Sequence, residues 1–191
     1  MIRIAFALLL LACPLLAQEP DPDMAALIEL GTPGPEHEHL TAMAGNWDVE
    51  GEFFVGPGQP MLQSKGQATF EVLLGGRYVR QVFTGDFMGE RFEGIGIEAY
   101  DKIKGKYVST WIDSMSTWVL TMEGDLDPTT GALNYTGTSP APERGPGQTK
   151  QVRSTTHYDR KAGVMKVSMS EVGPDGAEVV LMRLVYTKQQ D

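Results

Sequence analysis

Gly45-Asn46-Trp47 decides the fold, because it stands between a short helical segment and a long segment that alternates like a β-strand. A glycine can end a helix in a conformation that other residues avoid. The indole two residues later is large enough to fill one end of a closed barrel. These three residues therefore predict a β-barrel that starts at this point, with Trp47 as its plug.

Strand-like segments follow from residue 46 almost to the C-terminal end. The pattern of Asp, three residues and Gly recurs at 101–105, 127–131 and 159–163, which is the spacing of a short hairpin loop. Between the turns, β-branched and aromatic residues alternate with period two. Ten strands are predicted, roughly at 46–55, 60–73, 77–86, 89–100, 105–113, 117–126, 131–138, 149–159, 163–172 and 177–188. Closure removes both sheet edges, so the pattern favours a single antiparallel up-and-down barrel over a sandwich.

Two short helical segments precede the strands. Asp23–Leu30 and Pro35–Ala44 carry Ala, Leu and Met at helical spacing. The second has Pro35 in its first turn and Gly45 as its terminator, both common at helix ends. We expect these helices to cap or cover the barrel.

The N-terminal residues predict export. Residues 1–17 form a signal peptide, in which a basic start is followed by an apolar run too short to span a bilayer. Cleavage after Ala17 would leave residues 18–34 as a linker with a short helix and residues 35–191 as the barrel domain, in the periplasm or outside the cell. The alternative uses Cys13, because Leu10-Leu11-Ala12-Cys13 is similar to a bacterial lipobox and would anchor the protein by a lipid.

Composition narrows the function classes. The chain has 191 residues, 16 basic and 25 acidic side chains and a net charge of −9, which repels phosphate backbones and disfavours a nucleic-acid partner. After the first apolar run, no stretch is long enough for a transmembrane span. Cys13 is the only cysteine, so the mature chain has no disulfide and is held by its core.

Four segments together resemble a known family. These are HEHLTAMAGNWDVE at 37–50, LLGGRYV at 73–79, FEGIGIEAYD at 92–101 and KYVSTWIDSM at 106–115. They resemble the domain of unknown function 1579 family, which is grouped with lipocalin-like calycin barrels, and the similarity runs from about residue 34 to the C-terminus. The resemblance implies a secreted barrel of about ten strands and brings no established substrate, cofactor or catalytic residue. It also implies a cation stacked on Trp47, and Arg183 and Lys188 on the last strand are the candidates. Gly45 belongs to the same predicted plug.

Candidate ligand-binding residues come from three strands. Trp111 and Asp113 share one strand face, and with Met115 and Trp118 they flank a turn where an acid and an indole would orient an amphipathic ligand. The alternative is that the tryptophans pack and Asp113 caps the turn. Tyr78 and Arg80 share another face, where Arg80 either binds a carboxylate inside or pairs with Glu71 outside.

Histidines are few. His157 is the remaining ligand-binding candidate, although a single histidine is more often structural. No cofactor is expected, and haem is the alternative that such a histidine would serve. His37 and His39 lie two apart on a predicted helix and so do not predict a metal site. No sequence motif supplies a catalytic residue.

Two functions follow from this pattern. The first is an exported barrel that binds a small apolar or amphipathic molecule inside. The second is an enzyme or a structural envelope protein on the same barrel, with no ligand. Binding is the expected function, and enzymatic activity is not.

Overall fold

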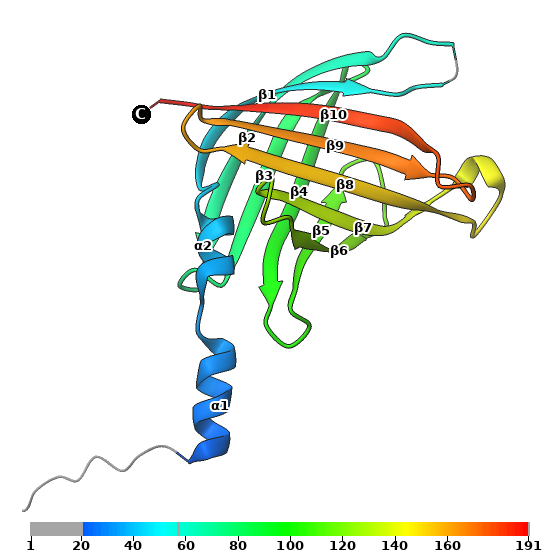
Figure 1. Cartoon of the computed structure of the whole chain (residues 1–191). Coiled ribbons are helices and arrows are strands. Elements are labelled where there is room, and N and C mark those ends of the chain that lie inside the picture. The colour runs from blue at the N-terminus through cyan, green and yellow to red at the C-terminus, as the bar shows by residue number, and fades with distance from the viewer. Residues whose placement is uncertain (1–20, 57, 191) are drawn as a thin grey trace, which may run out of the picture. The chain divides into compact units, whose positions relative to one another are not determined.

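A computed structural model describes residues 21–56 and 58–190 (Figure 1). The predicted signal segment and the alternative lipid anchor at Cys13 lie outside these residues. The chain divides after Gly31 into two compact units. The first contains α1 (Pro22–Gly31), none of whose residues is buried. In the part of the chain that the structure describes, no helix is both long and apolar enough to cross a membrane.

The second unit contains a closed antiparallel barrel, which confirms the predicted fold. Within residues 32–56 and 58–190, ten strands pair with their neighbours in chain order, and the last pairs with the first. The strands are β1 (Gly45–Phe53), β2 (Leu62–Leu73), β3 (Tyr78–Phe87), β4 (Glu90–Asp101), β5 (Lys106–Asp113), β6 (Leu120–Leu126), β7 (Ala132–Pro140), β8 (Thr149–Asp159), β9 (Val164–Val172) and β10 (Glu178–Lys188). Closure leaves no sheet edge, so the sandwich alternative is excluded.

The three Asp-x-x-x-Gly segments form hairpin turns of one kind. In the turn after β6, Asp127 Oδ1 accepts a 2.8 Å hydrogen bond from the Thr129 N–H, and Gly131 closes the turn at φ 71°. That backbone N–H holds the pKa of Asp127 below its ordinary value. Asp101 and Asp159 accept equivalent bonds in the turns after β4 and β8. The turn residues thus fixed the hairpins as predicted.

Helix α2 (Pro35–Thr41) lies against one end of the barrel, and the short 3₁₀ helix η1 (Pro142–Arg144) lies at the other (Figure 1). The Gly34 N–H donates a 3.0 Å hydrogen bond to Nδ1 of His37, which fixes the start of α2. His37 and Leu40 are the buried residues of this helix. The helix ends earlier than predicted, because the chain turns before Gly45 opens β1 at φ 129°.

Buried side chains occur along the whole inner wall. Trp47, Leu40 and Met165 are fully buried toward α2, and Val152 is fully buried on β8 nearer η1. Other inward side chains, among them Phe92, Trp111 and Val167, are only partly buried. The interior thus combines packed positions with positions that keep some accessible surface.

Candidate functional site

The strand register fixes which side chains face the interior. Trp47 on β1 is fully buried and pairs with Ala68 on β2, which in turn pairs with Phe83 on β3. Side chains of paired residues lie on the same face, and successive residues of a strand lie on opposite faces. The row continues through Gly94 on β4 and Asp113 on β5. Inward positions can therefore be assigned around the barrel.

Trp47 is fully buried near the α2 end of the barrel. Its ring lies edge-on to Tyr158 and Tyr186 at centroid distances of 5.3 and 6.4 Å. Its Nε1 donates a 3.0 Å hydrogen bond to the Met43 carbonyl, which ties the indole to the segment after α2. We call this group, with Phe70 at 6.1 Å, the floor.

Lys188 supplies the cation on Trp47. Its Nζ lies 5.4 Å from the centroid of the indole. Gly45 makes room for this contact, because a Cβ there would come within 2.9 Å of Lys188 Cε. The prediction for Arg183 is wrong. That residue faces outward, with its guanidinium 3.7 Å from Glu52, because an odd spacing from Lys188 places it on the opposite face of β10.

A carboxylate lies on the inner wall just above the floor. Glu98 on β4 accepts a 2.7 Å hydrogen bond from Ser109 Oγ and a 2.9 Å bond from the Tyr135 hydroxyl. Burial raises the pKa of Glu98 to about 7, and these two donors oppose the rise. Burial and the Glu98 charge raise the pKa of Tyr135 well above its ordinary value, so its hydroxyl keeps its proton and donates.

A second buried polar pair completes this cluster. Gln81 on β3 donates a 3.1 Å hydrogen bond from Nε2 to the hydroxyl of Tyr186 on β10. Burial raises the pKa of Tyr186 to about 12, and the charge of Glu98 adds to the rise. We call Gln81, Glu98, Ser109, Tyr135 and Tyr186 the inner polar cluster. Five side chains from five strands meet here, so the cluster is a product of closure.

Trp111 and Asp113 both face inward, which meets the condition set for them as a ligand site. Nε1 of Trp111 donates a 3.1 Å hydrogen bond to Asp113 Oδ2. The indole lies flat against β4, because a Cβ on Gly94 would come within 2.1 Å of the ring and one on Gly96 within 3.3 Å. Trp111 is only partly buried. An indole and an acid thus stand together on the open part of the inner wall.

The two remaining residues of that turn have different surroundings. Met115 is 63% exposed, and its N–H donates a 2.9 Å hydrogen bond to Asp113 Oδ1. Asp113 therefore also caps the turn, as the alternative prediction states. Trp118 is partly buried and packs against the core. Of these two, only Trp118 contacts the core.

Three other candidates face away from the interior. Tyr78 and Arg80 alternate with the buried Val79, and Arg80 pairs with Glu71 at 2.5 Å, the outer arrangement that the sequence also allowed. His157 is exposed on the outside of β8. Their prediction as interior ligand-binding residues is wrong, because the register places their side chains on the outer face.

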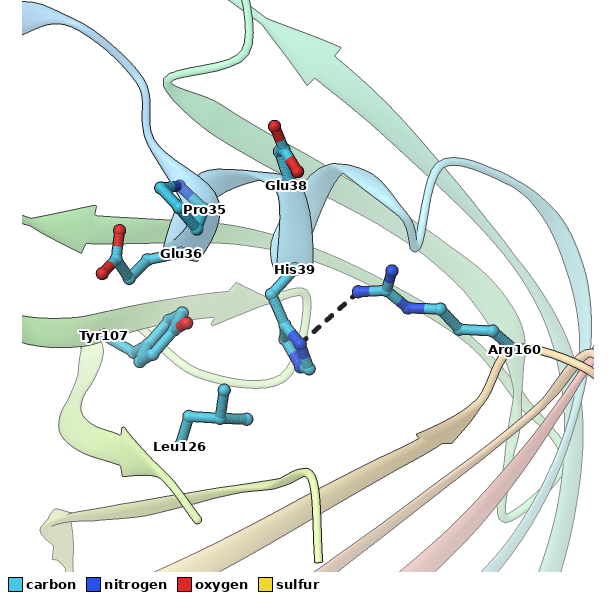
Figure 2. Close-up of a pocket in the computed structure, with 7 residues that line it drawn as sticks. All are labelled: Pro35, Glu36, Glu38, His39, Tyr107, Leu126 and Arg160. Carbon is cyan, nitrogen blue, oxygen red and sulfur yellow. Dashed lines mark hydrogen bonds between the residues drawn. The ribbon is translucent and has the colours of Figure 1, made fainter. Parts of the chain in front are cut away.

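A separate pocket opens beside α2. Its volume is about 260 Å³, and its lining residues are Pro35, Glu36, Glu38, His39, Tyr107, Leu126 and Arg160. Figure 2 shows His39 pointing from α2 toward Arg160, whose Nη2 lies 3.5 Å from His39 Nδ1. A guanidinium only donates, so Nδ1 accepts. Burial, with the nearby Arg160 charge, lowers the pKa of His39.

Tyr107 connects this pocket with the interior. Tyr107 is only 3% exposed, and its hydroxyl has no hydrogen-bond partner among the described residues. Burial raises its pKa to about 12. Tyr107 also lies close enough to Tyr135 to raise the pKa of that hydroxyl. The pocket therefore adjoins the inner polar cluster through a tyrosine.

The opposite end carries an ion-pair group. Lys150 on β8 lies 3.2 Å from Glu143 of η1 and 3.4 Å from Glu171 on β9. Arg144 of η1 also pairs with Glu171. These contacts fix η1 to the rim of the barrel. No group of three or more side chains suited to a metal ion lies together in residues 21–56 and 58–190.

Comparison with known proteins assigns the family. The model of the family described as "Protein of unknown function (DUF1579)" matches residues 32–188. The chain belongs to this family. The crystal structure of Rv2717c from M. tuberculosis is similar in fold, with a TM-score of 0.56 and 10% sequence identity over 83% of this chain and all of that one. No curated protein matches this sequence.

In this DUF1579 barrel, the inner polar cluster was missed by the sequence predictions. The signal was present in the segment 92–100, where Phe92, Gly94, Gly96 and Glu98 occur at every second position. Glycines and an acid do not predict a core face, whereas the isoleucines between them, Ile95 and Ile97, do. The isoleucines of this segment are on the outer face, and Ile95 is 43% exposed. The inward face is set by the pairing of all the strands around the barrel. It therefore cannot be identified from the hydrophobic pattern of this segment alone.

Proposed function

We propose that this protein binds a small amphipathic molecule inside its barrel. The observation that carries the proposal is the incomplete filling of the inner wall. Several inward apolar side chains pack on the core yet stay partly accessible, among them Phe92, Trp111, Val167, Met169 and Leu184. Accessible apolar surface inside a protein is a binding surface for apolar groups.

The inner polar cluster would bind the polar end of the ligand. Glu98 is held among aromatic side chains by two donors, at a cost in solvation that packing alone does not require. A pocket with mostly apolar walls and few fixed polar groups orients a ligand that has one polar end. The apolar body would lie against Trp111 and its neighbours.

Export completes the proposal. The basic start and apolar run of residues 1–17 support secretion to the periplasm or beyond, and Cys13 offers lipid anchoring as the other route. In either case the barrel would meet its ligand outside the cytoplasm. Loss of residues 1–17 from the protein recovered from its own host, measured by intact mass, tests this part.

The binding proposal is tested by filling the interior. Val167→Phe adds bulk on the inner face of β9, and Val185→Phe makes the same change on the outer face of β10, beside Lys166. The neutral fluorophore Nile red reports apolar binding sites by its emission. We expect the wild-type protein and Val185→Phe to bind it alike, and Val167→Phe to bind it about tenfold more weakly because it fills the accessible space.

Native mass spectrometry of protein purified from its own host adds a second measurement. A bound small molecule that is present in Val185→Phe and absent from Val167→Phe supports the proposal. Nile red that ignores the wild-type barrel, or that binds both variants equally, contradicts it. Equal thermal unfolding of the two variants is the control for folding.

A further inference from the structure

Glu98 is an acid on the inner wall with no basic partner. Among the ion pairs of the described residues, none reaches Glu98, and its hydrogen-bond donors are the neutral hydroxyls of Ser109 and Tyr135. The inward lysines are engaged elsewhere: Lys150 pairs at the η1 rim, and Lys188 lies over Trp47. A buried carboxylate is normally paired with a cation.

The groups around Glu98 accept hydrogen bonds and attract cations. Each carboxylate oxygen receives one hydrogen bond, and an ionised carboxylate has about four acceptor sites, so acceptor capacity remains. Gln81 uses Nε2 for Tyr186, and its Oε1 lies 3.6 Å from the position of a Cβ on Gly96, the inward neighbour of Glu98 on β4. The indole of Trp111 covers the same glycine.

A carboxylate, an amide oxygen and an aromatic face are the three groups that bind organic ammonium ions. We propose that the molecule held in the barrel is a lipophilic amine, whose protonated nitrogen binds Glu98 and whose apolar body lies along the Trp111 side of the inner wall. This inference rests on the proposed interior binding site and adds the chemical class of its ligand. The net charge of −9 favours the approach of a cation.

Ion pairing with an amine requires the ionised form of Glu98. Burial raises the pKa of Glu98 to about 7, so protonation competes with the amine below that pH. The titratable groups that face it, Tyr135 on β7 and Tyr186 on β10, keep their protons because burial raises their pKa values. Gln81 and Ser109, from β3 and β5, carry no charge. Glu98 is thus the group that would make binding depend on pH.

Three probes with the same chain separate the alternatives: decylamine, decanol and decanoate, each measured by displacement of Nile red from the full-length mature protein at pH 8. We expect decylamine to bind about tenfold or more tightly than decanol, because a charge-assisted hydrogen bond adds to the same apolar contact. Glu98→Gln should abolish this preference and leave decanol binding unchanged. Glu93→Gln removes an outward carboxylate from the same strand and should keep the preference.

The pH series provides an independent readout. Decylamine affinity should fall about tenfold per unit below pH 7 in the wild-type protein and stay flat in Glu98→Gln. Equal binding of decylamine and decanol in the wild-type protein, or tightest binding of decanoate, overturns the amine inference and leaves interior binding intact. Failure of all three probes to displace bound Nile red contradicts both the amine inference and the interior site.

Discussion

Trp47 and Trp111 show two uses of the same side chain on one inner wall. Both face inward, and each donates a hydrogen bond from Nε1, Trp47 to a main-chain carbonyl and Trp111 to Asp113. Trp47 has no exposed surface and is surrounded by rings, whereas Trp111 lies on glycine and stays partly accessible. The difference separates a residue packed into the closed end of the barrel from one that keeps accessible surface, which the proposed ligand would contact.

Replacing each tryptophan by alanine should give the largest contrast. Trp47→Ala removes a completely buried ring, and we expect the free energy of unfolding to fall by about 4 kcal/mol. Trp111→Ala removes a partly buried ring, with an expected loss of about 1–2 kcal/mol. Chemical denaturation measures both, and Nile red binding should be weakened only in Trp111→Ala once the folded fraction is matched. Equal losses of stability would remove the distinction between the two residues.

The inner polar cluster should reduce stability at high pH. The pKa of Glu98 is about 7 in the folded protein and 4.5 in an ordinary environment, so the folded state holds an extra proton between these values. The free energy of unfolding therefore falls as pH rises from about 4.5 to 7 and is flat above.

Glu98→Gln should remove this pH dependence. At pH 8 we expect it to raise the free energy of unfolding by up to about 3 kcal/mol, an upper limit because the side chain keeps some accessible surface. Denaturation at pH 5 and pH 8 measures the change, with the outward Glu93→Gln as the control. A wild-type protein whose stability rises over this range would contradict the placement of Glu98 in a poorly solvated site.

The packing of the Trp111 ring on β4 can be tested without changing the tryptophan. In Gly94→Ala, the new Cβ would lie 2.1 Å from Cζ2 of Trp111, so the ring must move off β4 and lose its bond to Asp113. We expect a loss of about 1–3 kcal/mol and a red shift of tryptophan emission. In Gly96→Ala the nearest ring atom is 3.3 Å away, and the effect should be below about 1 kcal/mol. A larger effect at Gly96 would show that the indole lies elsewhere.

The hairpins could be predicted from local sequence, whereas the faces of the strands could not. Asp127 provides the side-chain acceptor of its turn, and Gly131 provides the left-handed residue. Five consecutive residues are therefore enough to predict this turn. The direction of Arg80 or Trp111 depends on closure, which couples strands far apart in the chain. Inward glycines such as Gly94 blur the alternation, because they make room for a neighbour's ring and look like neither core nor surface.

The inner polar cluster depends still more on closure. Tyr186 meets Gln81 across 105 positions of sequence, and Tyr135 meets Glu98 across 37. No motif joins residues at such distances. The cation over Trp47 was expected from the family resemblance, and closure selects Lys188 because β1 lies beside β10 and Trp47 pairs with Lys188.

The smallest expected effect concerns Lys188, the cation over Trp47. It separates a cation–π contact from an effect of net charge. Lys188→Met keeps the aliphatic stem and removes the ammonium 5.4 Å from the Trp47 ring, and we expect a loss of about 1 kcal/mol. Arg183→Met removes an equal charge from the outer face of β10, where the contact with Glu52 is exposed, and should cost less than about 0.5 kcal/mol. Raised salt should weaken the Arg183 contribution more, because Lys188 is better shielded from solvent. Equal losses with equal salt dependence would mean that the cation on the floor acts only through net charge, and that Trp47 closes the barrel by packing alone.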